Sequence, residues 1–140
     1  MIKRFLNALI LGVSLSFSMP ALAQDSSQAL SASASVAGQM TLQKFSALLQ
    51  QGFKSVIVNR PDQEAGNTAP VSQLREIAEK SQVSVIYQPV ISGKISQTDI
   101  QEFAKYYNEL PKPVLLICRS GSRSASLFQQ AQTQGLLHDE

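Results

Sequence analysis

The residues that most clearly suggest a chemical reaction are the seven from Cys118 to Ser124, which read Cys-Arg-Ser-Gly-Ser-Arg-Ser. They follow an apolar run, residues 113–117, and this pattern predicts a buried strand that ends at the cysteine. In a loop between a strand and a helix, backbone N–H groups and the positive helix end converge on one point. A cysteine at that point can be held as the thiolate, which is the nucleophilic form. We therefore interpret Cys118, the only cysteine of the chain, as a catalytic nucleophile.

Two arginines make this loop unlike the surroundings of an ordinary structural cysteine. A lone cysteine at the end of an apolar strand is most often a small buried hydrophobe. Burying Arg119 and Arg123 beside it would cost too much free energy without an anion to receive their charge. We predict that Arg123 binds the negative charge of the transferred group through forked hydrogen bonds. The other predicted anion-binding residues of the loop are Arg119, Ser120, Gly121, Ser122 and Ser124.

Several of these residues also have simpler structural interpretations. One of the serines, Ser122 or Ser124, could cap the helix that follows. Gly121 is expected to supply a positive φ in the loop. Arg119 could point to solvent, and the charge of Arg123 could be matched by a nearby carboxylate.

A second group of polar residues, 59–64, follows the β-rich run 53–58. In a parallel sheet, ligands bind beyond the carboxyl ends of the strands, so this group is expected near the cysteine loop. We predict that Arg60 binds an anion and that Asp62 acts as a general acid. Asp62 could instead form an Asx turn after the proline. Glu64 could orient an arginine or remain a solvated charge.

The apolar pattern alternates between strand and helix periods. It predicts strands over 53–58, 83–90 and 114–117, and helices that begin at Thr41, near Val71, at the capping box Ser96–Asp99 and near Ser122. Such alternation implies a mostly parallel sheet with helices on both faces. The expected fold is therefore a three-layer α/β domain.

The first 23 residues predict a cleavable secretory signal peptide. Two basic residues precede an apolar run over residues 5–19, and Ala21-Leu22-Ala23 is a small-residue cleavage site. The apolar run is short for a membrane-spanning helix. We expect cleavage between Ala23 and Gln24, a periplasmic or secreted protein, and no stable membrane association after cleavage.

Residues 24–34 are rich in Ser, Ala and Gln and predict a flexible lead-in to a single domain over residues 35–140. The formal net charge of +2 comes from the two basic residues of the signal peptide, because the remainder has ten basic and ten acidic residues. This balance gives no reason to expect a nucleic acid as partner. An unpaired thiol in an oxidising compartment is a liability unless it is buried or used.

The chain resembles two groups of thiol enzymes. The loop from Cys118 to Ser124 resembles the active-site loop of single-domain rhodaneses, which are sulfurtransferases. Over about residues 36–135 the chain is similar to the phosphatase-like domain of the β-lactamase-hydrolase-like proteins, relatives of dual-specificity and tyrosine phosphatases. The matching segments are 52–64, 87–90, Gly93, Ile95 and 113–124. The resemblance implies a cysteine-phosphatase-like fold and a cysteine-dependent reaction.

Two departures from the phosphatase pattern leave the reaction open. Phosphatases of this superfamily usually have five residues between the cysteine and the arginine, whereas this chain has four, as rhodaneses do. The segment 89–93, which corresponds to the loop that carries the phosphatase general acid, has no acidic residue. The expected substrate is therefore a small anionic or sulfane-sulfur compound that forms a phospho- or persulfide intermediate on Cys118.

The alternative is a non-catalytic anion-binding or interaction module. No cofactor or metal is expected, because the sequence has no His/Cys cluster for zinc and no glycine-rich dinucleotide motif. The only histidine, His138, lies near the C-terminus.

Overall fold

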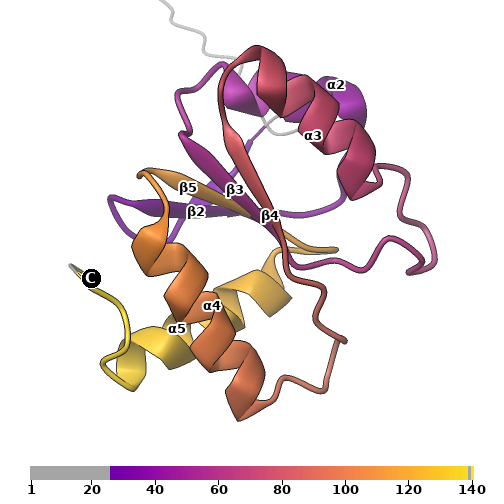
Figure 1. The fold of residues 1–140 in the computed structure, drawn as a ribbon. Helices are drawn as coiled ribbons and strands as arrows, with labels where there is room; N and C mark the ends of the chain where they lie inside the picture. The colour runs from indigo at the N-terminus through magenta and orange to yellow at the C-terminus, as the bar shows by residue number, and fades with distance from the viewer. Residues whose placement is uncertain (1–25, 139) are drawn as a thin grey trace, which may run out of the picture.

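The computed structural model describes residues 26–138 and 140, which form a five-stranded sheet in the order β1-β2-β5-β3-β4 (Figure 1). The strands are β1 (Gln28–Ala29), β2 (Ala34–Ala37), β3 (Ser55–Val58), β4 (Ser84–Tyr87) and β5 (Val114–Ile117). The helices are α2 (Leu42–Leu49), α3 (Val71–Lys80), α4 (Gln97–Glu109) and α5 (Ser122–Thr133). Strand β1 is antiparallel to β2, and the other neighbours are parallel. The predicted α/β class with a mostly parallel sheet is confirmed.

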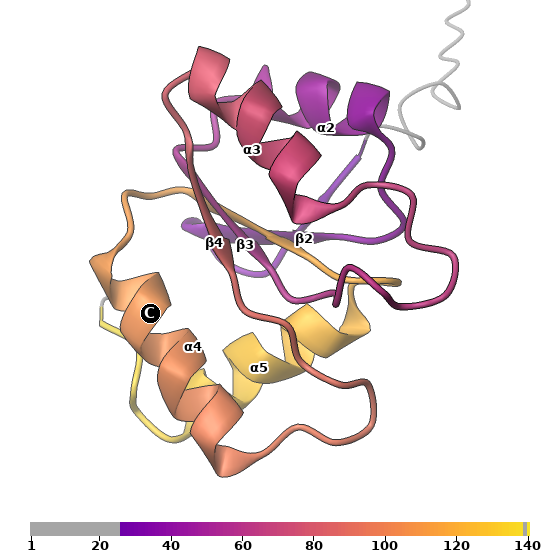
Figure 2. The same cartoon turned by 45° about the vertical axis from the view of Figure 1, so that its right-hand side comes forward.

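Helices cover both faces of this sheet, which gives three layers. Figures 1 and 2 show α2 and α3 on one face and α4 and α5 on the other. Each face has its own apolar cluster, and β3 and β5 contribute side chains to both. All residues of β3 and β5 are buried, as expected for central strands of a parallel sheet. Strand β5, which leads into the cysteine loop, is therefore fixed from both sides.

The predicted helix starts agree with the structure. The Thr41 hydroxyl accepts a hydrogen bond from the Lys44 amide and caps α2. Ser96 and Asp99 form a reciprocal capping box at the start of α4. Each cap therefore fixes the start of a helix that follows the carboxyl end of a strand, which is β2 for α2 and β4 for α4.

The N-terminal region contains a short strand that the sequence pattern did not predict. The predicted flexible lead-in, residues 24–34, overlaps β1, and Gln28 pairs with Val36 of β2. Small and polar residues carry no hydrophobic period here, so backbone pairing decides their structure. The predicted signal peptide lies outside the described residues. Within residues 26–138 and 140, no helix is long and apolar enough to cross a membrane.

The strand register brings three loop residues to one edge of the sheet. Ile117 of β5 pairs with Ala37 on one side and with Val58 on the other. The next residue of each strand, namely Gly38, Cys118 and Asn59, therefore lies at the same carboxyl edge. The backbone continues this pairing, since the Cys118 amide donates to the Ala37 carbonyl and the Asn59 amide to the Ile117 carbonyl. This edge holds the candidate active site.

Candidate active site

Cys118 lies in a short loop between the end of β5 and the start of α5. Its side chain is buried, with 1% of the residue exposed. The Gly121 amide donates a hydrogen bond to its Sγ over 3.1 Å. Gly121 has a φ of 94°, a left-handed conformation that favours glycine, and the predicted positive φ is confirmed. The loop therefore curls around the sulfur, and a thiolate would gain a backbone hydrogen bond.

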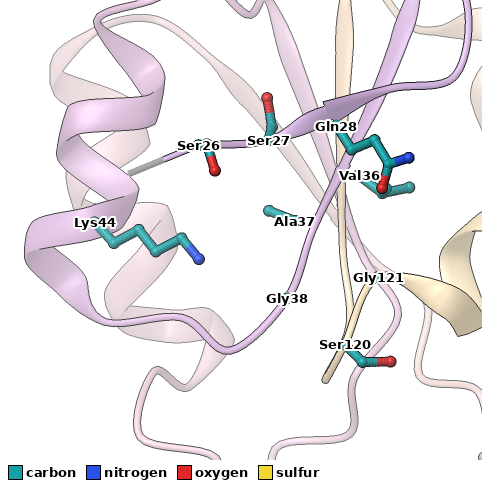
Figure 3. A pocket seen from close by; sticks show the side chains of 9 residues that line it. All are labelled: Ser26, Ser27, Gln28, Val36, Ala37, Gly38, Lys44, Ser120 and Gly121. Atoms are coloured by element: carbon teal, nitrogen blue, oxygen red, sulfur yellow. The ribbon is translucent and has the colours of Figure 1, made fainter. Parts of the chain in front are cut away.

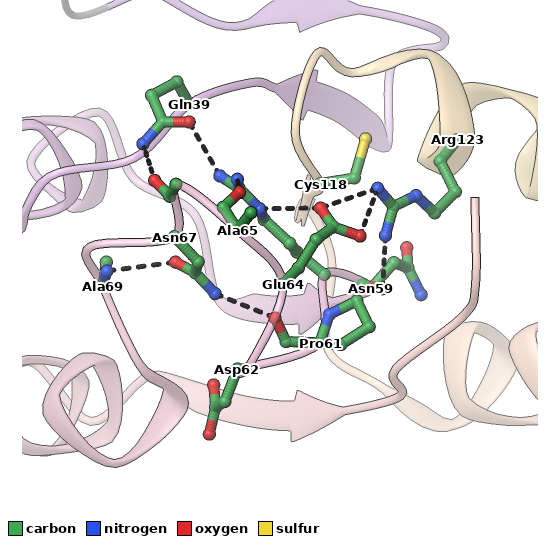
Figure 4. Close-up of polar contacts among 12 residues, drawn as sticks. Gln39, Asn59, Pro61, Asp62, Glu64, Ala65, Asn67, Ala69, Cys118 and Arg123 are labelled. Carbon is green, nitrogen blue, oxygen red and sulfur yellow. Dashed lines mark hydrogen bonds and ion pairs between the residues drawn. The ribbon is translucent and has the colours of Figure 1, made fainter.

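Arg123, in the first turn of α5, is also buried and is held by several acceptors. Its Nη1 donates to the carbonyl oxygens of Val90, over 2.9 Å, and of Asn59, over 3.4 Å. Its Nη2 lies 3.0 Å from each carboxylate oxygen of Glu64. Its Nε is buried and has no hydrogen-bond partner among the described residues. Figure 4 shows this guanidinium at the same end of α5 as the Cys118 sulfur.

Glu64 joins two arginines. Its Oε1 accepts a hydrogen bond from Arg60 Nε over 2.9 Å, and both of its oxygens contact Arg123. The hydrogen bond from Arg123 lowers the pKa of the Glu64 carboxyl below its ordinary value of 4.5, and Arg60 acts in the same direction. Partial burial acts against this lowering but does not overcome it. Glu64 therefore remains ionised and orients the arginine, one of the two roles predicted for it.

The lowered pKa of Glu64 predicts a pH dependence of folding. The unfolded chain binds this proton more readily, so the stabilisation is complete above about pH 4.5 and is lost as pH falls through the lowered pKa. Wild-type protein should therefore lose more unfolding free energy on acidification than Glu64→Gln. Urea unfolding at several pH values would measure this, with Glu76→Gln, an exposed position on α3, as control. If the unfolding free energy changes with pH equally in all three proteins, the expectation is wrong.

Arg60 is held by the loop in which it lies. It is only 3% exposed, and its three nitrogens donate to Glu64, to the Gln39 side chain and to the Ala65 carbonyl. These bonds tie the guanidinium of Arg60 to the loop 60–67 and to Gln39. This arrangement favours a role for Arg60 in stabilising the loop that carries Glu64, and its predicted anion binding stays a prediction.

Asp62 is turned away from the cysteine. Its backbone amide donates to the Tyr87 hydroxyl over 2.8 Å, and its Oδ1 accepts a hydrogen bond from the Val71 amide over 2.9 Å. The carboxylate thus binds the first amide of α3, and in Figure 4 it points away from Cys118. This placement favours a structural role over the predicted role as general acid.

The remaining residues of the cysteine loop divide into an exposed and a buried group. Arg119, Ser120 and Ser122 are exposed, and the hydroxyls of the two serines lie 2.8 Å apart. Ser124 is fully buried and donates to Oδ1 of Asn59 over 2.8 Å. Ser124 therefore links α5 to the end of β3, an arrangement that favours a structural role over the predicted anion binding.

The match to known proteins agrees with this geometry. Residues 27–135 match the family described as "Beta-lactamase hydrolase-like protein, phosphatase-like domain". The chain belongs to this family. The resemblance noted from the sequence is therefore confirmed, and the chain is a phosphatase-like domain.

The relatives differ greatly from this chain in length. The Beta-lactamase hydrolase-like protein of Agrobacterium fabrum (strain C58 / ATCC 33970) is 32% identical over 93 residues. This match covers 66% of the present chain but only 22% of the relative. The chain thus spans about a fifth of the length of the curated relatives it matches.

Solved structures share the fold. A protein described as a candidate phosphatase from Neisseria meningitidis has a TM-score of 0.68 and 28% identity, covering 76% of this chain and 77% of that one. The core catalytic domain of a PP-IP phosphatase from S. cerevisiae has a TM-score of 0.56 and 17% identity, covering 71% and 62% of the two chains. At the latter identity the similarity concerns the fold alone. The phosphatase-like domain therefore has the cysteine-phosphatase fold.

Asn59 is a site residue to which the sequence analysis gave no role. It is fully buried, its carbonyl accepts from Arg123, and its side chain joins Ser124 to Gln88. The signal was its position directly after a buried strand, where a polar residue must find partners. In this phosphatase-like domain, Asn59 ties three elements together beneath the cysteine loop.

Gly38 fixes the other side of the loop. A Cβ at this position would lie 3.0 Å from the Arg119 carbonyl oxygen and 3.1 Å from the Ser120 Cα. Both are backbone atoms, so no side-chain rotation can relieve the contact. The end of β2 and the cysteine loop therefore pack closely only because residue 38 has no side chain.

We expect Gly38→Ala to destabilise the domain by about 1–3 kcal/mol, as overpacking commonly does. It should also lower activity, because the loop must shift away from its present shape. Urea unfolding and turnover, measured beside Ala32→Ser in the exposed turn between β1 and β2, would check this. Wild-type stability and turnover in Gly38→Ala would show that the loop shape does not depend on Gly38.

Proposed function

We propose that this domain is a cysteine-dependent hydrolase of phosphate monoesters, in which Cys118 is the nucleophile and Arg123 binds the phosphoryl oxygens. The observation that supports this most is the buried Nε of Arg123, which has no partner among the described residues while both Nη atoms are anchored. A buried donor left unpaired costs about 1–3 kcal/mol. A phosphoryl oxygen held in the cysteine loop would accept this hydrogen bond.

The proposed reaction has two steps. The Cys118 thiolate attacks phosphorus, an S–P bond forms, and the bond from phosphorus to the leaving oxygen breaks. Water then attacks the phosphocysteine, which releases phosphate and restores the thiolate. The loop amides and Arg123 stabilise the negative charge on the phosphoryl oxygens in both steps.

The proton needed by the leaving oxygen is expected to come from water. The segment 89–93 has no acidic residue, and the Asp62 carboxylate is bonded to the Val71 amide. We therefore predict a steep dependence on the leaving group, with 4-nitrophenyl phosphate hydrolysed faster than phenyl phosphate and far faster than glycerol phosphate. Initial rates of the three esters would test this. Hydrolysis of none of them, or equal rates for all three, would overturn the proposed reaction.

Sulfur transfer is the second candidate, and the tight enclosure of Cys118 favours it. Cys118 is 1% exposed, and only four residues separate it from Arg123. A single sulfur atom needs less room than a phosphoryl group. In this reaction the thiolate attacks the outer sulfur of thiosulfate, the S–S bond breaks, sulfite leaves, and a persulfide remains on Cys118.

Mass spectrometry after thiosulfate treatment separates the two candidates. One added sulfur on the peptide that contains Cys118, without ester hydrolysis, would favour the sulfurtransferase. Ester hydrolysis without added sulfur would favour the phosphatase. Phosphate binding with neither reaction would favour the non-catalytic anion-binding module.

We also propose that the mature protein works in the periplasm or outside the cell, because residues 1–23 have the pattern of a signal peptide. Intact-mass analysis of protein recovered from the periplasm should give a chain that begins at Gln24. Recovery of the full-length chain from the cytoplasm or the membrane would overturn this location.

A further inference from the structure

A hollow of about 240 Å³ lies against the cysteine loop and is not used by the proposed chemistry (Figure 3). Ser120 and Gly121 form the side that it shares with the loop, and Ser27, Gln28 and Lys44 lie around it. Its volume is below the roughly 300–1,000 Å³ of pockets that enclose drug-sized ligands. It is therefore suited to a small ligand, or to one part of a larger ligand.

Three elements bring the hollow to the same edge of the sheet as Cys118. Because β1 is antiparallel to β2, Gln28 at its start lies beside the carboxyl end of β2. Lys44 stands in the first turn of α2, and Gly121 is the N-cap residue of α5. The hollow is on the β2 side of the cysteine loop, whereas the guanidinium of Arg123 is anchored on the β3 side. A ligand in the hollow would thus lie next to a group held in the loop.

The chemistry of the hollow suits an anion. Among residues 26–138 and 140, Lys44 is the only charged residue that lines it, and Ser27, Gln28 and Ser120 add hydrogen-bonding groups. The Lys44 ammonium donates to the Gln39 carbonyl over 3.1 Å, which uses one of its three donors. Figure 3 shows the Lys44 side chain extending from α2 toward the hollow. The first turns of α2 and α5 contain no acidic residue, so their positive ends are not neutralised there.

We propose that this hollow is a second anion subsite, and that the preferred substrates carry a second anionic group beside the one transferred to Cys118. The second group would be held by Lys44 and by hydrogen-bonding groups of Ser27, Gln28 and Ser120. Ser120 lies between the two subsites, because it belongs to the loop and also lines the hollow. This proposal rests on the proposed function only for the identity of the first group.

Binding of inorganic phosphate to the Cys118→Ser protein, followed by NMR of the backbone amides, tests the subsite without any turnover. Phosphate is expected to change the amide chemical shifts at two places, first at Arg123 and second at Ser27 and Gln28. Lys44→Gln should weaken the second set about tenfold, the effect of losing one charge-assisted hydrogen bond, and should leave the first set in place. Absence of phosphate-dependent shifts at Ser27 and Gln28 would overturn the proposal.

The matched control is Lys54→Gln. Lys54 is exposed and directly precedes β3, at the opposite edge of the sheet. The substitution Lys54→Gln therefore removes one positive charge, as Lys44→Gln does, but at a position away from the hollow. If Lys44→Gln and Lys54→Gln weaken phosphate binding at Ser27 and Gln28 equally, the effect comes from the net charge of the protein, and the proposed subsite is overturned.

A second arm asks whether one ligand can use both subsites. Calorimetry on the Cys118→Ser protein would compare alkanediol bisphosphates of increasing length with the corresponding monophosphates. One chain length should bind about tenfold more tightly than its monophosphate, and Lys44→Gln should remove this gain. No gain at any length would overturn the two-group substrate. The proposed hydrolysis is tested separately by turnover of 4-nitrophenyl phosphate. If the wild-type protein does not hydrolyse this ester, the proposed function fails, but the binding results on the Cys118→Ser protein still decide the subsite.

Discussion

Cys118→Ser is expected to abolish the hydrolysis of aryl phosphates, with a loss of about three orders of magnitude or more. A serine hydroxyl is far less nucleophilic than a thiolate unless a general base activates it. In the described part of the chain, the nearby carboxylate of Glu64 is engaged by Arg60 and Arg123, so it is not positioned as such a base. Steady-state kinetics with 4-nitrophenyl phosphate would measure the loss.

The fold of this variant should be unchanged. Within the described residues, the Cys118 sulfur accepts one hydrogen bond, from the Gly121 amide, and a serine oxygen can accept it as well. Circular dichroism and urea unfolding should therefore match the wild type. Retained turnover in a folded Cys118→Ser protein would mean that another residue is the nucleophile.

Arg123→Lys is expected to lower turnover about 10²–10³-fold, the usual cost of removing a donor that stabilises a developing oxyanion. Lysine has no planar fork and cannot donate from Nε, Nη1 and Nη2 in fixed directions. It would also leave some of the three acceptors, on Val90, Asn59 and Glu64, without their hydrogen bonds. Unfolding free energy should therefore fall by about 1–3 kcal/mol.

Arg119→Lys is the matched control for this change. Arg119 lies in the same loop but is exposed, so the same substitution should change turnover and stability little. Kinetics and urea unfolding of the two variants would be compared at one ionic strength. Equal losses in both variants would show that the effect is not specific to the buried guanidinium of Arg123.

The features that the sequence determined are those set by neighbouring residues. The apolar run before Cys118 identified a central strand, and the glycine and serines after it identified a tight loop and a helix start. The caps at Thr41 and at Ser96–Asp99 were readable because a helix cap involves residues only three positions apart. Alternating strand and helix periods were enough for the fold class, since such elements bury their apolar faces in few ways.

Side-chain direction in the segment 59–64 was decided only by the tertiary structure. The spacing placed Arg60, Asp62 and Glu64 near the cysteine, but it could not say which of them faces it. Asp62 turns to the first amide of α3, and Arg60 is held by Gln39 and by its own loop. Only Glu64 reaches Arg123, across 59 positions of the chain. Such choices depend on which partner is close in space and on the cost of leaving a buried charge unpaired.

The N-terminal edge and the hollow also depended on tertiary structure. Strand β1 has two exposed residues, and its pairing with β2 comes from backbone hydrogen bonds that leave no trace in side-chain periodicity. The contact of Gly38 with the cysteine loop and the position of Lys44 beside Ser120 follow from that arrangement. These residues come from segments about 80 positions apart, and only the register of β2 against β5 brings them together.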